Sequence, residues 1–117
     1  MNPTIPEKDW KTFRDMKKLL LQNQCQKALE RIRRILDKPT RDAHATYLAI
    51  FKAIEKEDKI IASMFDDHRR STAFVSILSM VQHRLLSKDD IQRFTPETQE
   101  RIQTCTEALK LDHPNGK

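Results

Sequence analysis

Apolar residues recur at the helical period of about 3.6 residues from Asp9 to Asp37. Asp9 can cap the start of this helix, and Lys38 ends it because the residue before Pro39 avoids the α region. The pattern therefore predicts one long amphipathic helix over residues 9–37. Its apolar stripe consists of Trp10, Phe13, Met16, Leu20, Leu21, Cys25, Ala28, Leu29, Ile32, Ile35 and Leu36.

A second helical pattern begins after Thr40 or Asp42, either of which can cap a helix. It carries an apolar stripe on one face, and the charged residues from Glu55 to Lys59 occupy much of the opposite face. An amphipathic helix of this kind buries its apolar stripe against a neighbour. We therefore expect burial of Tyr47, Leu48, Phe51, Ile54, Ile61 and Phe65.

The segment from Ala73 to Leu86 differs, because its apolar residues point to all sides. A helix that is apolar all round is either the central helix of a bundle or part of an interface between subunits. No glycine or proline separates this segment from the preceding one, so residues 42–86 can form one helix of about 60 Å. We favour this continuous helix over the alternative, a break between Asp66 and Ser71.

Two short helices are predicted at the C-terminal end of the chain. Ser87 and Asp90 are spaced as a capping box, with Asp in place of the usual Glu. Thr95 can cap the next helix, and Pro96 suits its first position, where a missing N–H costs nothing. Residues 1–8 and 112–117 are expected to fray.

Glycine is almost absent from this chain. No glycine or proline lies between Pro39 and Pro96, and Gly116 is the only glycine. Tight turns and phosphate-binding loops need glycine, so a sheet of several hairpins or a P-loop is excluded. A chain of 117 residues is the size of one domain. We therefore predict an all-α fold over residues 1–117: a four- to five-helix bundle with a long central helix or helical hairpin and a short C-terminal helix pair.

The net charge of +5 comes entirely from residues 1–40, which hold ten Lys and Arg against five Asp and Glu. Four cations on the first helix share one stripe that points away from the apolar face, and a phosphate backbone could follow such a stripe. No aromatic residue interleaves with it for base stacking, so an ordinary solvated face is favoured over a nucleic-acid interface. The stripe consists of Lys27, Arg31, Arg34 and Lys38, with Arg41 just beyond its end.

The densest polar cluster runs from Asp66 to Ser71. On a continuous helix, His68 would share the apolar stripe of Tyr47, and so would Asp58 and Thr72. One interpretation is a ligand or catalytic site built on these three residues. The other, which we favour, is a structural histidine with a satisfied partner, since histidines are often partly buried without a catalytic task.

Known catalytic and metal-binding patterns are absent. The sequence holds neither Glu-x-x-His nor His-Glu-x-x-His, and Cys25 and Cys105 lie on apolar stripes, where an inert thiol is expected. We therefore expect no enzyme activity, no metal and no cofactor. The absence of a long apolar run or a signal-peptide pattern indicates a cytoplasmic protein without a membrane span.

These observations favour a non-enzymatic helical protein–protein interaction or regulatory module. We expect it to act as a homodimer and to bind a further, unidentified protein partner. We expect Phe74, Ile77, Leu78 and Val81 to form the interface or the core directly beneath it. The alternative is a nucleic-acid-binding protein of weak sequence specificity that uses the basic stripe of the first helix.

Overall fold

The computed structural model describes residues 4–38 and 42–112. Within these ranges the secondary structure is entirely helical, with five α-helices and one 3₁₀ turn, which confirms the all-α bundle. The elements are α1 (Glu7–Asp37), α2 (Ala43–Phe65), η1 (Arg70–Thr72), α3 (Ala73–Gln82), α4 (Lys88–Ile91) and α5 (Pro96–Asp112).

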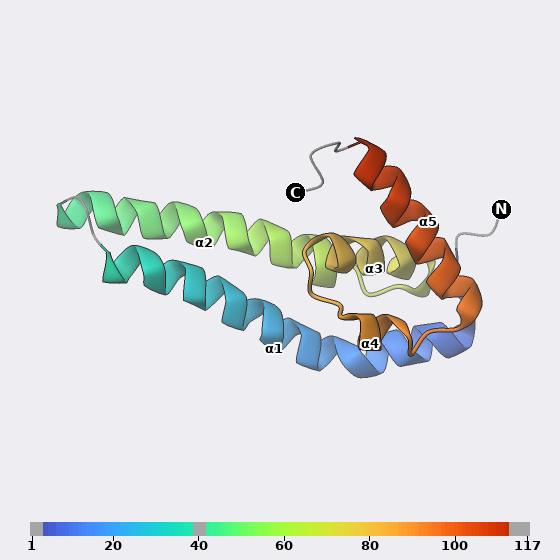
Figure 1. Cartoon of the computed structure of the whole chain (residues 1–117). Helices are drawn as coiled ribbons and strands as arrows, with labels where there is room; N and C mark the ends of the chain where they lie inside the picture. The colour runs from blue at the N-terminus through green and yellow to red at the C-terminus, as the bar shows by residue number, and fades with distance from the viewer. Residues whose placement is uncertain (1–3, 39–41, 113–117) are drawn as a thin grey trace.

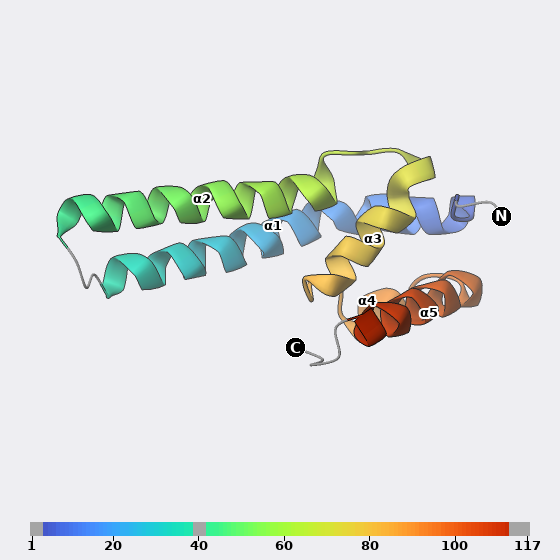
Figure 2. The same ribbon diagram turned by 90° about the horizontal axis from the view of Figure 1, so that it is seen from above.

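The two long helices α1 and α2 form an antiparallel hairpin, and the shorter helices gather at one end of it (Figure 1). That end holds the start of α1 and the end of α2, while the other end of the hairpin extends away from α3, α4 and α5 (Figure 2). The molecule is correspondingly elongated, with principal extents of 53 × 32 × 23 Å. The hairpin therefore has an inner half, covered by the short helices, and an outer half that α3–α5 do not cover.

The hydrophobic core lies in the inner half, where all five helices meet. It combines residues of α1, α2, α3 and α5 with Ile5, which is fully buried although residues 1–8 were expected to fray. Its largest members are Phe13, Met16 and Leu20 of α1, Met64 of α2, Phe74, Ile77 and Met80 of α3, Phe94, and Ile102 of α5.

The prediction of one continuous helix over residues 42–86 is wrong. Helix α2 ends at Phe65, and the chain reaches α3 through residues 66–69 and η1, which is the alternative break near Asp66 to Ser71. Because α2 runs antiparallel to α1, a straight continuation would carry the apolar residues of α3 beyond the start of α1. The break instead folds the apolar residues of α3 back into the core that contains Phe13. The Arg70 Nε donates to the Ile5 carbonyl at 2.9 Å, and this bond stabilises the turn.

Helix α3 is shorter and less uniformly buried than the predicted segment 73–86. It ends at Gln82, and Leu85 and Leu86 are buried from the connection that follows. Val75 keeps 67% of its surface exposed, so one side of α3 is open although every side carries apolar residues.

The chain after α3 agrees closely with its predicted caps. The Ser87 hydroxyl accepts from the Asp90 N–H at 3.1 Å, and the Asp90 carboxylate accepts from the Ser87 N–H at 3.0 Å, which confirms the capping box of α4. Helix α5 begins at Pro96 as predicted, directly after Thr95. Asp42 caps α2 by accepting from the Ala45 N–H at 2.8 Å, whereas the other candidate, Thr40, lies outside the described residues.

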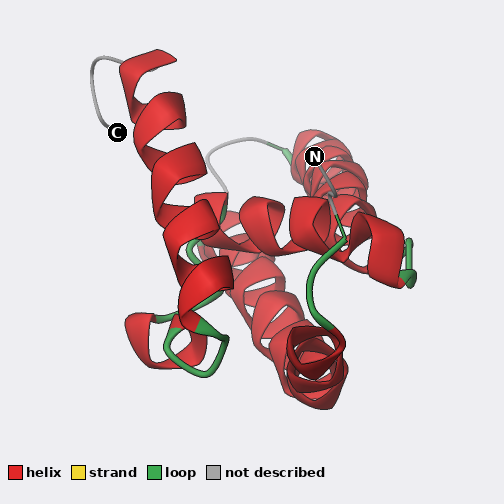
Figure 3. Ribbon diagram, turned by 90° about the vertical axis from the view of Figure 1, so that its right-hand side faces the viewer, coloured by secondary structure: helices red, strands yellow, loops and turns green. Residues whose placement is uncertain are grey.

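Asp9 does not cap α1, which begins two residues earlier after Pro6. Its side chain is fully buried and serves α5 instead, because it accepts from the Thr95 N–H at 2.8 Å, the Thr95 hydroxyl at 2.6 Å and the Thr98 hydroxyl. This bond set fixes the start of α5 beside the first turns of α1, and from there α5 extends away from the hairpin (Figure 3). A carboxylate is favourable here because the N-terminus of a helix is the positive end of its dipole.

Candidate functional site

Large apolar side chains are exposed along the outer half of the hairpin. Six of them keep between 41% and 65% of their surface exposed, although their positions belong to the apolar stripes predicted for the two long helices. Isolated exposed apolar residues are normal, but a contiguous group of this size marks an interaction surface. The six residues are Leu29 and Leu36 of α1 and Tyr47, Leu48, Phe51 and Ile54 of α2.

The predicted burial of the α2 stripe is therefore wrong for its first four members. Helix α2 meets α1 through a neighbouring face that carries Glu57 and Met64, both of which are buried. Ile61 and Phe65, at the inner end of the stripe, are partly buried. The apolar surface of α2 is thus wider than one partner helix can cover.

These exposed residues lie on one side of the hairpin. Arg31 and Glu57 are bonded to each other, so each marks the side of its helix that faces the other helix. Measured from these two residues, the apolar positions lie roughly 60–160° around each helix axis, with the same direction of rotation on both helices. In two antiparallel helices, equal rotations about each axis bring both sets to the same side. We call this side the hairpin face, made of Leu29, Ile32 and Leu36 of α1 with Tyr47, Phe51 and Ile54 of α2, and Leu48 at its edge.

Helix α3 and the connection after it occupy the opposite side of the hairpin. The Lys27 Nζ donates to the Arg84 carbonyl at 2.9 Å, and the Ser63 and Ser79 hydroxyls lie 3.4 Å apart. Measured from Arg31 on α1 and from Glu57 on α2, Lys27 and Ser63 lie in the direction of rotation opposite to that of the apolar positions. The hairpin face therefore stays clear of every other described helix.

The basic stripe of α1 is exposed at Arg31, Arg34 and Lys38, but two of its cations also have partners within the chain. Arg31 turns toward α2 and donates from Nε and Nη2 to the two carboxylate oxygens of Glu57, the latter at 2.7 Å. The hydrogen bond from Arg31 holds the pKa of the Glu57 carboxyl below its usual range and raises the pKa of Arg31 itself. With Lys27 bound to a carbonyl, only Arg34 and Lys38 of the stripe are free in solvent, and Arg41 lies outside the described residues.

The four residues expected at a subunit interface lie mainly in the core of this chain. Phe74 and Ile77 are buried and belong to the core cluster, and the Arg101 guanidinium lies 4.1 Å from the Phe74 ring centroid. Leu78 and Val81 are partly buried and pack against the same cluster. Their part in a subunit interface, or in a core directly beneath one, stays a prediction.

Asp58, His68 and Thr72 do not share one helical face, because α2 ends before His68. His68 lies in the connection after α2 rather than on a helix, Asp58 is exposed on α2, and Thr72 precedes α3. The His68 Nδ1 accepts from the Lys17 Nζ at 3.0 Å, and its ring lies 5.1 Å from that of Trp10. Burial lowers the pKa of Lys17, and the nearby Asp67 charge opposes this shift. His68 is thus a partnered residue of the turn.

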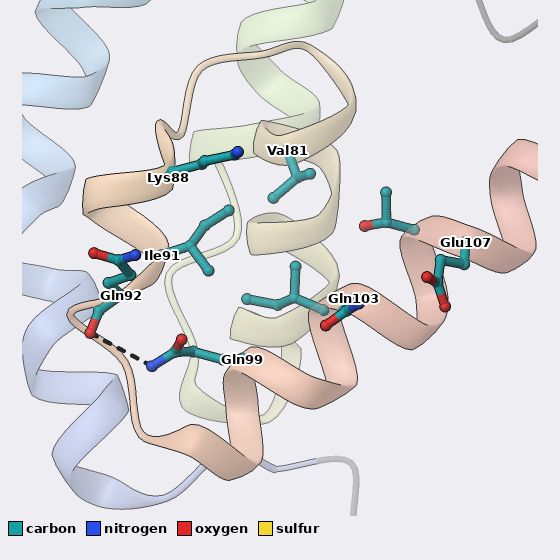
Figure 4. A pocket seen from close by; sticks show the side chains of 9 residues that line it. Val81, Lys88, Ile91, Gln92, Gln99, Gln103 and Glu107 are labelled. Carbon is teal, nitrogen blue, oxygen red and sulfur yellow. Dashed lines mark hydrogen bonds between the residues drawn. The ribbon is translucent and has the colours of Figure 1, made fainter.

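A shallow pocket of about 410 Å³ lies between α3, α4 and α5 (Figure 4). Its floor is apolar, from Val81, Ile91 and Ile102, and its rim is polar. Gln99 closes one end by donating to the Phe94 carbonyl at 2.8 Å. The described residues contain no group of three or more His, Cys, Asp or Glu placed to hold a metal, and Cys25 and Cys105 are free, partly buried thiols.

Two features of the molecule escaped sequence reasoning. Gln24 is buried on α1 at the end of the core, and the inward turn of Arg31 depends on Glu57 from another helix. The sequence signal for Gln24 was its position: it follows Phe13, Met16 and Leu20 on one helical stripe.

No helix among the described residues combines the length and apolar character needed to cross a membrane. No protein-family model, no curated protein and no solved structure matches this chain.

Proposed function

We propose that this protein is a non-enzymatic protein–protein interaction module that forms a homodimer through the hairpin face. The observation that carries the proposal is the group of exposed apolar side chains on one side of two antiparallel helices. Removing apolar surface from water is favourable by roughly 25 cal/mol per Å² of apolar area, so covering this surface would stabilise a complex.

A second copy of the chain is the occupant that fits this surface. Two hairpins that stack face to face complete a four-helix bundle, in which every helix gains a second neighbour. In a dimer with a two-fold axis, the hairpin face of one chain contacts the hairpin face of the other, so no second, complementary surface is needed.

The hairpin face spans about eight residues of each helix, from Leu29 to Leu36 and from Tyr47 to Ile54. At about 1.5 Å per residue this is a length of about 12 Å, and two helices, each about 10 Å wide, give a footprint of roughly 240 Å². This is well below the value of about 800 Å² per partner in a standard interface, so the proposed dimer is a weak one.

The interface proposed here replaces the one expected on α3, since Phe74 and Ile77 are used by the core of the chain. Nucleic-acid binding is less favoured, because Lys27 and Arg31 are held by partners within the chain. It becomes an outcome of the test below.

The test compares two substitutions of exposed apolar residues by sedimentation equilibrium. We expect the wild type to be a dimer at tens of micromolar, and Phe51→Lys to be a monomer because the charge would be buried in the interface. Val75→Lys is the matched control, since Val75 is also an exposed apolar residue but lies on α3. Both variants should keep the wild-type melting temperature within a few degrees.

A wild-type protein that stays monomeric at several hundred micromolar would refute the proposal. A dimer that Phe51→Lys leaves intact would also refute it. Submicromolar binding to a duplex or single strand, lost between 50 and 200 mM salt, would establish the nucleic-acid alternative instead.

A further inference from the structure

A second pocket, of about 500 Å³, lies on the side of the hairpin opposite the hairpin face. It forms where the end of α3 meets the middle of α1 and α2, so three parts of the chain line it. We call it the notch. The residues that matter here are Gln24, Lys27 and Arg31 of α1, Lys56 and Glu57 of α2, and Arg84 after α3.

The notch is strongly basic. Its only carboxylate among the described lining residues, Glu57, is used by Arg31 in a two-point ion pair. Lys27, Lys56 and Arg84 have no carboxylate partner within the part of the chain that the structure describes, and His83 adds a further titratable group at the rim. Three uncompensated cations from three different elements thus converge on one pocket.

Gln24, which lines the notch, carries an unused polar group that is closed to solvent. Its side chain is only 2% exposed, and its Oε1 has no hydrogen-bond partner among the described residues. A buried amide oxygen without a partner is costly, and such groups are rare in folded proteins. An acceptor of this kind is suited to a ligand hydroxyl.

Arg84 occupies a backbone position that normally belongs to glycine. Its φ is 58°, the Leu85 N–H donates to the Met80 carbonyl at 2.8 Å, and the Arg84 N–H donates to the Val81 carbonyl at 3.0 Å. These bonds form a Schellman motif at the end of α3, in which Arg84 stands at the left-handed residue. A charged side chain held in an unfavourable backbone conformation beside a pocket is a pointer to function.

We propose that the notch binds a small phosphate ester that also carries hydroxyl groups. Lys56 and Arg84 supply charge-assisted hydrogen bonds to the phosphate oxygens, Lys27 adds its charge while its Nζ donates to the Arg84 carbonyl, and the Gln24 Oε1 accepts from a hydroxyl of the ester once the amide turns toward the notch. The volume of the notch lies within the range of small-ligand pockets, about 300–1,000 Å³. Because it lies away from the hairpin face, this site is independent of the proposed dimer.

The test uses glucose 6-phosphate as the probe, with glucose and inorganic phosphate for comparison, in titration calorimetry of the full chain. We expect one saturable site for glucose 6-phosphate, binding at least ten-fold weaker for inorganic phosphate, and no detectable binding of glucose. Lys56→Gln and Arg84→Gly should each weaken the ester roughly ten-fold, since each removes one charged contact. Both side chains are exposed, so both variants are expected to fold.

Two further variants separate the notch from general surface charge. Lys52→Gln removes a cation one helical turn from Lys56 on α2 and should leave the affinity unchanged. Gln24→Leu should lower the affinity for glucose 6-phosphate until it equals the affinity for inorganic phosphate. The affinity for inorganic phosphate should stay unchanged. A merely structural Gln24 would leave both affinities unchanged.

Vesicles of phosphatidylcholine with and without phosphatidylinositol 4-phosphate distinguish the source of the ester. Binding of both the vesicles and glucose 6-phosphate would identify a lipid headgroup, and binding of the soluble ester alone would identify a free metabolite; both outcomes support the notch. Absence of saturable binding of glucose 6-phosphate at millimolar concentration would overturn the proposal. So would an affinity that Lys56→Gln and Lys52→Gln reduce equally.

Discussion

The buried carboxylate of Asp9 joins α1 to the start of α5, and Asp9→Ala tests its role. The side chain is fully buried and accepts three hydrogen bonds, two from Thr95 and one from Thr98. Alanine would remove the acceptor, leave the Thr95 N–H without this partner, and leave the two hydroxyls only their 3.4 Å contact with each other at the start of α5.

The expected loss of stability follows from the number and kind of these bonds. A hydrogen bond to a charged group contributes about 1.5–3 kcal/mol, and a donor left buried and unpaired costs a similar amount. The three bonds share one acceptor and are not additive, so the free energy of unfolding should fall by about 3 kcal/mol in total. For a chain of this length that corresponds to a drop of roughly 10–15 °C in melting temperature.

Urea denaturation at pH 7, followed by circular dichroism, measures this change. Asp15→Ala is the matched control, because Asp15 is an exposed carboxylate on the same helix, and it should stay within about 0.5 kcal/mol of the wild type. Asp9→Asn keeps one acceptor oxygen and should fall between the two. If Asp9→Ala is as stable as Asp15→Ala, the reasoning about this bond set is refuted.

Two further predictions concern α2 and the end of α3. Arg31 holds the pKa of Glu57 below its usual range, so the Glu57 carboxylate stabilises the fold above about pH 4.5 and loses this effect as the pH falls through the lowered folded value. Glu57→Gln should therefore lower the free energy of unfolding by about 1–2 kcal/mol at pH 7, and this difference should shrink below pH 4.5. The control Glu55→Gln, at an exposed position, should show neither effect. A difference that is constant from pH 7 to pH 3 would contradict this prediction. Arg84→Gly should raise the stability by about 1 kcal/mol, because glycine adopts a positive φ without strain, whereas Arg84→Ala should not; equal melting temperatures for the two variants would contradict that explanation.

Local signals in the sequence predicted several helix ends, although not the start of α1 or the end of α3. Asp42, the Ser87–Asp90 pair and Pro96 all stand where the helices begin, because a cap is a hydrogen bond between residues two or three positions apart. Such contacts need no knowledge of the rest of the fold. The same is true of the end of α1 before Pro39.

Contacts between distant segments could not be predicted in this way. Periodicity showed that Phe51 belongs to an apolar stripe, but it could not show that α2 would meet α1 through the adjacent face around Glu57. The break after Phe65 lies in the polar cluster from Asp66 to Ser71, but that cluster contains no glycine or proline and is also compatible with a continuous helix. Asp9 was interpreted as a local cap, whereas its partners lie 86 and 89 residues away.

The candidate sites show the same division. The basic stripe was found in the sequence, but the inward turn of Arg31 depends on Glu57, which lies 26 residues away. The notch combines Gln24, Lys56 and Arg84, and no spacing rule connects these three residues. Only the folded arrangement of α1, α2 and the connection after α3 brings them together.

The extension of the hairpin beyond the core has a consequence for how the protein opens. Past the Arg31–Glu57 pair, each long helix packs mainly on the other within one described chain, while Phe13, Leu20 and Ile77 are enclosed by several elements. Local opening is cheapest where few buried apolar contacts must be broken. In the monomer, amide hydrogens of α1 after Arg31 and of α2 before Glu57 should therefore exchange with solvent through a partial opening of the outer half. Those around Phe13 and Ile77 should exchange only when the whole chain unfolds, so the Arg31–Glu57 pair would mark a boundary between a fast and a slow zone of exchange.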